Sequence, residues 1–271
     1  MRLAQDPFTI TIDVEEYEGG SSRVEDVMNS VLDLCETSNV QITAFVVGEL
    51  AVKYPKLIQR IANGGHEIAL HGINHQTIDK WAPKDFISEC KSTCSRLSDL
   101  AGQKIYGFRA PLFSMNPNTS WLPDGLSECG FSYSSSVVPI KQLRSGTSYP
   151  GAPKTAFLWP SGLVELPAAT AWGLPIGGAY LRLFPKVLVK RMIHHLPKIA
   201  PWIYLHPYDF DCDEPFRVLP GTSGQIESRV LFFRRKVMKS CLQEFLKNNI
   251  GPPLIEVVKN LRLADLTTFT G

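Results

Sequence analysis

Short apolar runs alternate with longer segments of helical periodicity along most of this 271-residue chain. Strands that alternate with helices are typical of a parallel sheet, because each helix returns the chain to the edge of the sheet where the next strand starts. The pattern therefore predicts an α/β fold. About seven strand–helix units favour a distorted (β/α) barrel.

The expected elements follow from this periodicity. Strands are expected at residues 8–14, 42–47, 66–70, 105–109, 131–135, 163–166, 202–206 and 254–258. Helices are expected at residues 23–38, 54–63, 83–100, 118–129, 185–198 and 225–248. Residues 139–162 are rich in Gly, Pro and Ser and predict a long loop that borders the active site. We find no internal repeat or domain boundary, so a single domain over 1–271 is expected.

Composition narrows the class of protein. Hydrophobic residues make up 44% of the chain, which supports a sizeable core. The net charge is only +2 without a basic tail, so nucleic acid is not expected as a partner. Residues 1–7 lack the apolar core of a signal peptide, and no run of about 20 apolar residues predicts a transmembrane segment. We therefore expect a cytoplasmic protein, and six scattered cysteines are expected as buried, reduced thiols.

His71 and His75 follow the strand expected at 66–70. In an extended strand, residues four apart lie ~13 Å from each other, too far to share one metal ion. On a turn of helix they lie ~6 Å apart on one face, and Gly72 and Asn74 also suit a turn at the end of a strand. The pair is a candidate for two metal ligands, with ordinary surface or core histidines as the alternative.

Other polar residues also stand at the ends of expected strands. Alternation along residues 8–14 places Asp13 and Glu15 on one face of the first strand. Arg109 ends the fourth strand and could hold a carboxylate by a bidentate pair. His206 ends a late strand and could donate a proton near neutral pH. Helix capping, structural ion pairs and a core histidine are the alternatives for these four.

Together these motifs read Asp-x-Glu, His-x-x-x-His, Arg-x-Pro and Leu-His-Pro, each at an expected strand end. This order resembles the polysaccharide deacetylase family, the NodB-homology or carbohydrate esterase 4 group, over residues 8–210. The first motif, Asp13-Val14-Glu15-Glu16, is similar to the branch with an Asp-Val-Glu-Asp type motif, as are residues 177–185 and 205–211.

The resemblance implies a NodB-like barrel of fewer than eight repeats that binds a divalent metal, with zinc as the expected ion. By family position the metal ligands would be Glu15, His71 and His75. Asp13 would be the general base, and Arg109 would orient it.

The resemblance also implies the groups that face the substrate. His206 would be the general acid, and the backbone N–H of Leu112 would stabilise the oxyanion. We expect Tyr180 and Arg182 to contact the substrate. Aromatic residues that could stack on sugar rings, or pack in the core, are Trp81, Trp121, Trp159, Trp172, Tyr180 and Tyr208.

Three positions depart from the family pattern. Val14 replaces the usual second aspartate, and Glu15 is placed to substitute for it. Ser134 replaces the aspartate of a Tyr-Asp-Ser-Ser motif, so His206 is expected to lack its usual partner. Leu112 stands where Tyr or Trp is more common, and only its backbone N–H is needed.

The expected reaction is removal of an N-acyl group, acetyl or formyl, from a sugar. That sugar could be nucleotide-linked, lipid-linked or polymeric, in the assembly of O-antigen, capsule or exopolysaccharide. A carbohydrate-binding pseudoenzyme and a deacylase of non-sugar amides are the alternatives. The oligomeric state is left open.

Overall fold

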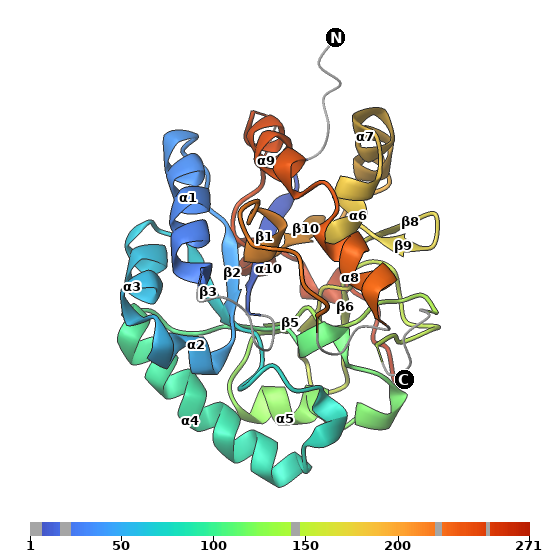
Figure 1. Ribbon diagram of the computed structural model, residues 1–271. Coiled ribbons are helices and arrows are strands. Elements are labelled where there is room, and N and C mark those ends of the chain that lie inside the picture. The colour runs from blue at the N-terminus through green and yellow to red at the C-terminus, as the bar shows by residue number, and fades with distance from the viewer. Residues whose placement is uncertain (1–6, 17–22, 142–146, 220–223, 248–249) are drawn as a thin grey trace.

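Eight strands form one curled sheet in the computed structural model, which describes residues 7–16, 23–141, 147–219, 224–247 and 250–271 (Figure 1). The strand order is β10-β1-β2-β3-β4-β5-β7-β6. All neighbours are parallel except β6 and β7. The bounds are β1 Thr9–Val14, β2 Thr43–Val46, β3 Glu67–Leu70, β4 Gly107–Phe108, β5 Tyr133–Ser134, β6 Phe157–Leu158, β7 Val164–Glu165 and β10 Trp202–Leu205; β8 Thr170–Ala171 and β9 Leu174–Pro175 form a separate hairpin. The prediction of a distorted barrel with seven parallel strands is confirmed.

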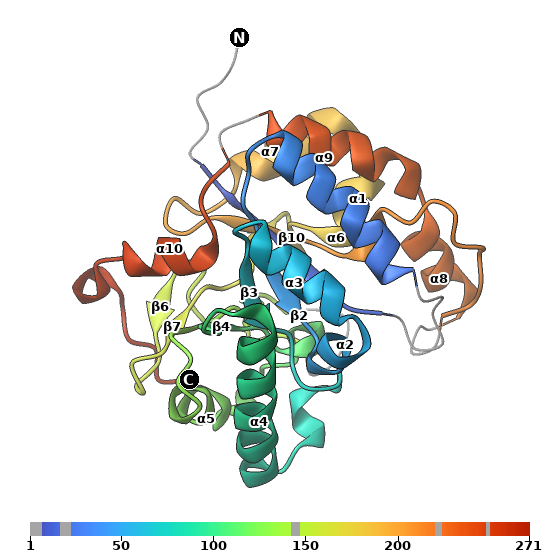
Figure 2. The ribbon, with the colours of Figure 1, turned by 90° about the vertical axis from the view of Figure 1, so that its left-hand side faces the viewer.

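Helices cover the outer face of the sheet, and α1, α3 and α4 lie along one side of it (Figure 2). The helices are α1 Val24–Thr37, α2 Gly48–Lys53, α3 Pro55–Asn63, α4 Pro83–Ala101, α5 Leu122–Glu128, α6 Gly178–Leu183, α7 Lys186–His194, α8 Gln225–Phe232, α9 Met238–Leu246 and α10 Leu254–Lys259. Short 3₁₀ helices are η1 Ile78–Lys80, η2 Pro111–Phe113, η3 Pro117–Thr119, η4 Pro207–Asp209, η5 Arg235–Val237 and η6 Leu263–Asp265. Among the described residues, no helix is both long and apolar enough to cross a lipid bilayer.

Strand β1 has the two-faced pattern that its sequence predicts. Ile10 and Ile12 are fully buried in the core that packs against the outer helices. Thr11 and Asp13 point to the inside of the barrel, where both contact the guanidinium of Arg109. The apolar face therefore anchors the strand, and the polar face delivers side chains to the barrel interior.

The expected strand at 254–258 is wrong, because this segment is helix α10. A short apolar run fits a buried helix as well as a strand, and Pro253 stands at the helix start. The first N–H groups of α10 bind side chains of the sheet: Leu254 N donates to Thr43 Oγ1 (2.8 Å) and Ile255 N to Glu67 Oε2 (2.9 Å). Helix α10 thus closes the N-terminal end of the barrel (Figure 2).

The expected long helix at 225–248 is divided into α8, η5 and α9. Arg234 adopts a left-handed backbone (φ +54°) that interrupts the helix. The next residue, Arg235, turns inward and forms a buried ion pair with Glu214, 2.6 Å between Nη1 and Oε2. Tertiary pairing therefore overrides the helical periodicity at this point.

Other expectations are corrected in detail. The expected loop 139–162 contains β6, and its described residues Tyr149, Phe157 and Trp159 pack around Phe269 near the end of the chain. Residues 142–146 of this loop lie outside the described part. All six cysteines are free thiols, but Cys212 is exposed, so burial was the wrong expectation for it.

Glu67 provides a test of how α10 is held. Its carboxylate accepts hydrogen bonds from Thr43, Tyr133 and the N–H of Ile255, all inside the protein. Glu67→Gln replaces one acceptor atom by a donor, so the free energy of unfolding in urea should fall by about 1–3 kcal/mol. The same change at exposed Glu49 should alter it by less than about 0.5 kcal/mol. Equal effects at the two positions would contradict this role of Glu67.

Candidate metal and catalytic site

Glu15, His71 and His75 come together at the C-terminal ends of β1 and β3. One ligand atom from each of the three lies within 4.8 Å of the others. Glu15 Oε2 lies 3.0 Å from His71 Nε2 and 2.6 Å from His75 Nε2. The sequence prediction of these three as one cluster therefore agrees with the geometry, while their role as metal ligands stays a prediction.

A tight turn, rather than a helix, brings the two histidines together. Gly72 has φ +69°, and a Cβ there would meet the ring of Pro111 at 2.5 Å. His75 itself has a left-handed backbone, φ +57°. The two imidazole centroids are 5.4 Å apart as a result. The turn gives the spacing that an extended strand could not.

The donor set fits a divalent cation. His71 Nδ1 lies 3.0 Å from the carbonyl oxygen of Arg109, which can only accept, so Nδ1 carries the proton. His71 Nε2 is then the ring nitrogen that faces the carboxylate of Glu15, 3.0 Å from Oε2. Buried His75 Nε2 has no hydrogen bond of normal geometry among the described residues, despite its short distance to Glu15. Two imidazole nitrogens and a carboxylate that converge on one point suit zinc or a similar ion.

Glu15 is held from its other oxygen as well. Tyr208 donates from its hydroxyl to Glu15 Oε1 (3.1 Å), which leaves Oε2 for the histidines. Burial raises the pKa of Glu15, but the charge of His75 and the contacts with both histidines lower it well below its usual value. The carboxylate is therefore ionised at neutral pH and available as a ligand.

Asp13 lies beside this cluster in a buried ion pair with Arg109. Arg109 Nη1 contacts Asp13 Oδ1 and donates to Thr11 Oγ1 (2.9 Å). The other oxygen, Asp13 Oδ2, is 4.0 Å from His71 Nε2 and 4.0 Å from His206 Nε2. One oxygen is thus fixed by the arginine, and the other faces both the histidine cluster and the expected general acid.

His206 has an acidic partner that the sequence analysis did not find. Asp209 Oδ2 accepts from the backbone N–H of His206 (2.9 Å) and lies 3.1 Å from its Nδ1. The expectation that His206 lacks a partner is therefore wrong, because η4 returns an aspartate three residues later. The signal in the sequence was the local His-Pro-Tyr-Asp turn.

Arg182 lies in this same network. It is fully buried, and its Nη2 donates to Asp209 Oδ1 (2.8 Å). Its Nη1 donates to the carbonyl oxygen of Phe233 (2.7 Å). The structure therefore corrects the expected substrate contact: Arg182 holds Asp209, which in turn holds His206. Tyr180 lies half-buried on the same helix, and its expected substrate contact stays a prediction.

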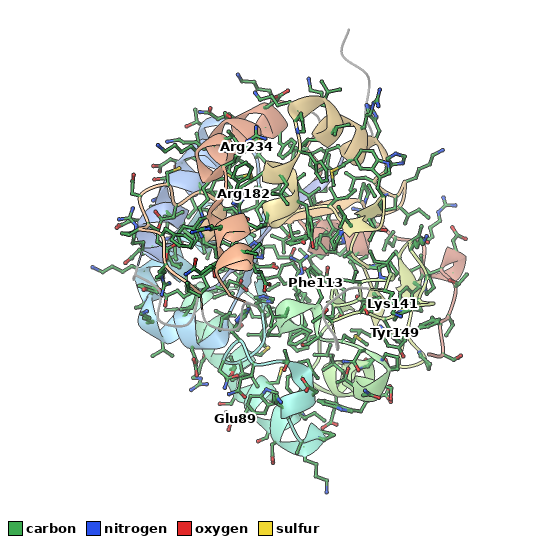
Figure 3. All side chains as sticks on the ribbon, turned by 45° about the vertical axis from the view of Figure 1, so that its right-hand side comes forward. Glu89, Phe113, Lys141, Tyr149, Arg182 and Arg234 are labelled. Atoms are coloured by element: carbon green, nitrogen blue, oxygen red, sulfur yellow. The ribbon has the colours of Figure 1, made fainter. Side chains whose placement is uncertain are left out.

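Leu112 has a strained backbone next to the site. Its φ of +55° is in the left-handed region, which is uncommon for a side chain of this kind. Such strain often marks a functional position, and the role of the Leu112 N–H stays a prediction. The next residue, Phe113, packs edge-on to Tyr204 with 5.2 Å between ring centroids and faces outward near the centre of the barrel (Figure 3).

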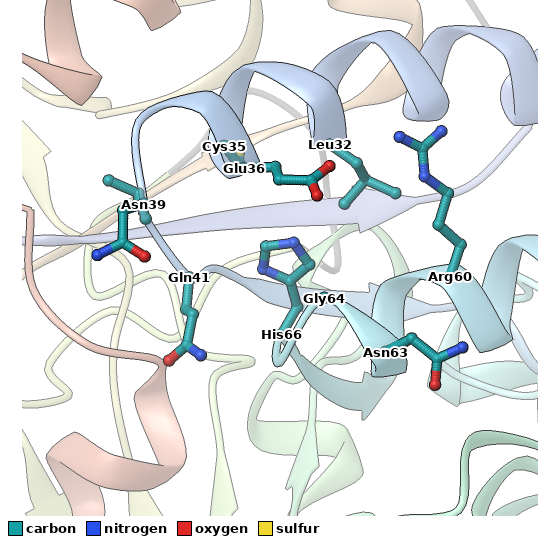
Figure 4. Close-up of a pocket in the computed structure, with 10 residues that line it drawn as sticks. Leu32, Cys35, Glu36, Asn39, Gln41, Arg60, Asn63, Gly64 and His66 are labelled. Atoms are coloured by element: carbon teal, nitrogen blue, oxygen red, sulfur yellow. The ribbon is translucent and has the colours of Figure 1, made fainter.

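His66 belongs to the same sequence stretch but not to the site. It precedes β3, whereas His71 follows it, so the two lie at opposite ends of the strand. His66 Nδ1 accepts from the N–H of Ile42 (3.2 Å), and its ring points into a hollow of about 400 Å³ between α1 and α3 (Figure 4). The length of β3 therefore separates His66 from the cluster of Glu15, His71 and His75.

A curled parallel sheet with a carboxylate and two histidines at its C-terminal edge defines a class of (β/α)-barrel proteins with a metal site. Residues 4–133 match the family model of polysaccharide deacetylases. Residues 135–249 match a family described as a domain of unknown function, DUF3473. The first half of the chain is therefore similar to the polysaccharide deacetylase family, the NodB-homology or carbohydrate esterase 4 group, and most of the second half is similar to the DUF3473 family.

Relatives in sequence agree with this family. A peptidoglycan-N-acetylglucosamine deacetylase of Bacillus cereus is 35% identical over 81 residues, which cover 30% of this chain and 30% of that protein. A peptidoglycan deacetylase-like protein of Gibberella zeae is 31% identical over 100 residues, 36% of this chain and 28% of that protein. The matches thus span less than a third of the length of these relatives.

Solved structures share the fold. A protein of Mycobacterium smegmatis described as a polysaccharide deacetylase superposes with a TM-score of 0.59 at 19% identity, over 100% of this chain and 96% of that chain. A carbohydrate esterase 4 pseudoenzyme of Bacillus anthracis gives a TM-score of 0.50 at 12% identity, over 98% and 67% of the two chains. At these identities the likeness shows the fold alone.

Asp209 should set the pH range in which His206 is protonated. Burial lowers the pKa of His206, but the hydrogen bond that His206 donates to Asp209 and the charges of Glu15, Asp209 and Asp13 outweigh it, so the pKa is raised. Asp209→Asn removes one of these charges and lowers that pKa. The basic limb of the kcat/KM profile should then move to lower pH by on the order of one unit. Exposed Asp79→Asn is the control, and an unmoved basic limb in Asp209→Asn would contradict this role.

Tyr208 should affect metal affinity through Glu15. Tyr208→Phe removes the hydroxyl that binds Glu15 Oε1 but keeps the ring that stacks on His206, with centroids 4.5 Å apart. Affinity for zinc, measured by competition with a chromophoric chelator, should fall about 10- to 100-fold. Tyr54→Phe, which removes a hydroxyl bound to Glu16 instead, should leave the affinity unchanged. Equal affinities in the two variants would show that the Tyr208 hydroxyl does not support the site.

Proposed function

We propose that this chain is a divalent-metal-dependent hydrolase that removes an N-acyl group from a sugar. The observation that carries the proposal is the convergence of Glu15, His71 and His75 beside the ion-paired carboxylate of Asp13. A structural ion pair alone would not require the ring nitrogens of two histidines at the same carboxylate oxygen. The match of residues 4–133 to the family model of polysaccharide deacetylases supports the same reaction type.

The residues around the cluster match the demands of amide hydrolysis. A divalent metal held by Glu15, His71 and His75 would lower the pKa of a bound water and stabilise negative charge on the acyl oxygen. Asp13 takes the proton of the attacking water at Oδ2, because Oδ1 is held by Arg109. The backbone N–H of Leu112 adds a donor for the oxyanion.

His206 completes the reaction from the other side. An amide nitrogen leaves poorly unless it is protonated. His206 Nδ1 is engaged by Asp209, so Nε2 is the nitrogen that can donate a proton to the departing amine. Nε2 lies 4.0 Å from both Asp13 Oδ2 and Glu15 Oε1, so base and acid face the same small space.

The substrate is proposed as an N-acetylated or N-formylated sugar of a bacterial surface polysaccharide, such as O-antigen, capsule or exopolysaccharide. Zinc is the proposed ion, because one carboxylate and two imidazoles are ligands that zinc prefers. The sugar could be nucleotide-linked, lipid-linked or polymeric. A cytoplasmic location stays a prediction. Support for these finer points comes from the first motif, Asp13-Val14-Glu15-Glu16, and its likeness to exopolysaccharide enzymes.

A pseudoenzyme with the same barrel is the second candidate. Val14 in place of the usual second aspartate and the fold neighbour of Bacillus anthracis favour it. The partner that Asp209 gives to His206 favours turnover instead, because an unused acid would not need such a network. Hydrolysis of a non-sugar amide uses the same residues and differs only in substrate.

Removal of one histidine tests the proposal. Wild-type protein should bind close to one equivalent of metal and release acetate or formate from a panel of N-acyl sugars. His71→Ala should lose the metal and reduce kcat/KM by at least about 10³-fold. His194→Ala, at an exposed histidine of α7, should match the wild type in both measurements. Metal well below one equivalent in the wild type, with no further loss in His71→Ala, would refute the metal-hydrolase function.

A further inference from the structure

Helix α8 exposes its apolar side and buries a polar one. Ile226, Val230 and Phe233 are 81%, 37% and 49% exposed, and spacings of four and three residues place them on one face. The fully buried residue of α8 is Ser228, whose Oγ accepts from the N–H of Leu219 (2.9 Å). The helix and its C-cap residue Phe233 therefore leave three large apolar side chains exposed, although Leu231 and Phe232 are half-buried, whereas the apolar face of an ordinary surface helix packs on the core.

The exposed apolar surface continues beyond α8. Phe216 and Val218 are 48% and 49% exposed, and the ring of Phe216 contacts that of Phe232 on α8, 5.3 Å between centroids. Five of the ten exposed large hydrophobic residues in the described chain thus fall between 216 and 233. We call Phe216, Val218, Ile226, Val230 and Phe233 the apolar stripe. Single exposed apolar residues are ordinary, but a contiguous group of this kind indicates a binding surface.

Basic side chains flank the apolar stripe. Arg229 lies over the ring of Phe216 (5.9 Å), and Arg234 lies by the ring of Phe233 (6.0 Å). Both are exposed, as is Lys236. Glu227 is the one exposed acidic residue among the described residues 224–239. Aromatic and aliphatic groups bordered by cations are typical of surfaces that bind anionic lipid interfaces.

The stripe lies at the mouth of the barrel, close to the candidate active site. The carbonyl oxygen of Phe233 binds Arg182, which holds Asp209 beside His206. Helix α8 lies on the side opposite α10, which closes the other end (Figure 2). The fully buried Arg182 and the exposed Arg234, which follows Phe233 in the chain, lie in the same part of the molecule (Figure 3). A partner bound to the stripe would therefore border the entrance to the site.

We propose that the apolar stripe and its flanking arginines form a surface that docks on an anionic lipid bilayer. A symmetric contact between two copies through the stripe would bring the same cations together, which is unfavourable. An anionic bilayer neutralises those cations and buries the apolar side chains without requiring a matching shape. Docking would present the barrel mouth to sugars carried on a lipid. The docking itself does not depend on the proposed hydrolysis.

Vesicle binding by the full chain tests the proposal. Vesicles of phosphatidylcholine with about 30 mol% phosphatidylglycerol should bind the protein at least about ten-fold more tightly than pure phosphatidylcholine. Ile226→Ser and Val230→Ser should each weaken that binding by about five-fold or more. Arg229→Gln combined with Arg234→Gln should abolish the preference for the anionic lipid. Matched controls on α7, Val187→Ser (66% exposed at Val187) and Lys190→Gln, should bind as the wild type does.

Four outcomes would overturn the proposal. The stripe variants could bind vesicles as the α7 controls do, or the wild type could bind both lipids equally. The wild type could ignore vesicles while Ile226→Ser changes its mass in light scattering, which would assign the stripe to a second copy. Binding to soluble polyglutamate but not to vesicles would assign it to an acidic protein partner. Activity on a soluble N-acyl sugar should be the same in all stripe variants, so loss of docking and failure of the proposed hydrolysis are distinguishable.

Discussion

The buried ion pair between Arg109 and Asp13 is the interaction on which the rest of the site depends. The guanidinium lies inside the barrel between the rings of Phe45 (3.9 Å) and Trp202 (4.3 Å), completely shielded from solvent. Burial lowers the pKa of Arg109, and the charge of Asp13 opposes that effect. A buried charge is tolerated only when it is paired and hydrogen-bonded, so the barrel interior and the carboxylate constrain each other.

Arg109 also connects Asp13, the expected base, to the cluster of Glu15, His71 and His75. The side chain of Arg109 fixes one oxygen of Asp13, while its backbone carbonyl fixes the tautomer of His71. On the opposite side, the short turn η4 provides two supports: Tyr208 for Glu15 and Asp209 for His206. Two local segments therefore orient the expected base, the expected acid and two of the three expected metal ligands. Glu15 can be held firmly, although it departs from the family pattern, because Tyr208 and His71 both contact its carboxylate.

Much of this arrangement could be predicted from the sequence. The carboxyl ends of parallel strands meet at one edge, so Asp13, His71, Arg109 and His206 at four strand ends had to lie near one another. The alternation in β1 was enough to place Asp13 and Glu15 on the inner face. These inferences needed only strand order and the two-residue period of a strand.

The remaining features depend on tertiary contacts that periodicity does not encode. The segment at 254–258 is helical because Thr43 and Glu67, far away in sequence, accept its first N–H groups. Arg182 is buried because it pairs with Asp209, so the resemblance of residues 177–185 to the family branch did not reveal its place in this network. Helix α8 leaves Ile226 and Val230 exposed in the described protein, which an argument from core packing could not anticipate.

The most direct test of the central claim is the position of a bound metal in crystals grown with zinc, located by anomalous diffraction. The account predicts one zinc bound by Glu15, His71 and His75, with distances of about 2.0–2.2 Å to Glu15 oxygen and histidine nitrogen. Asp13 should remain paired with Arg109 and outside the ligand shell. A zinc ion bound by Asp13 in place of Glu15, or no zinc at this cluster at saturating concentration, would contradict it.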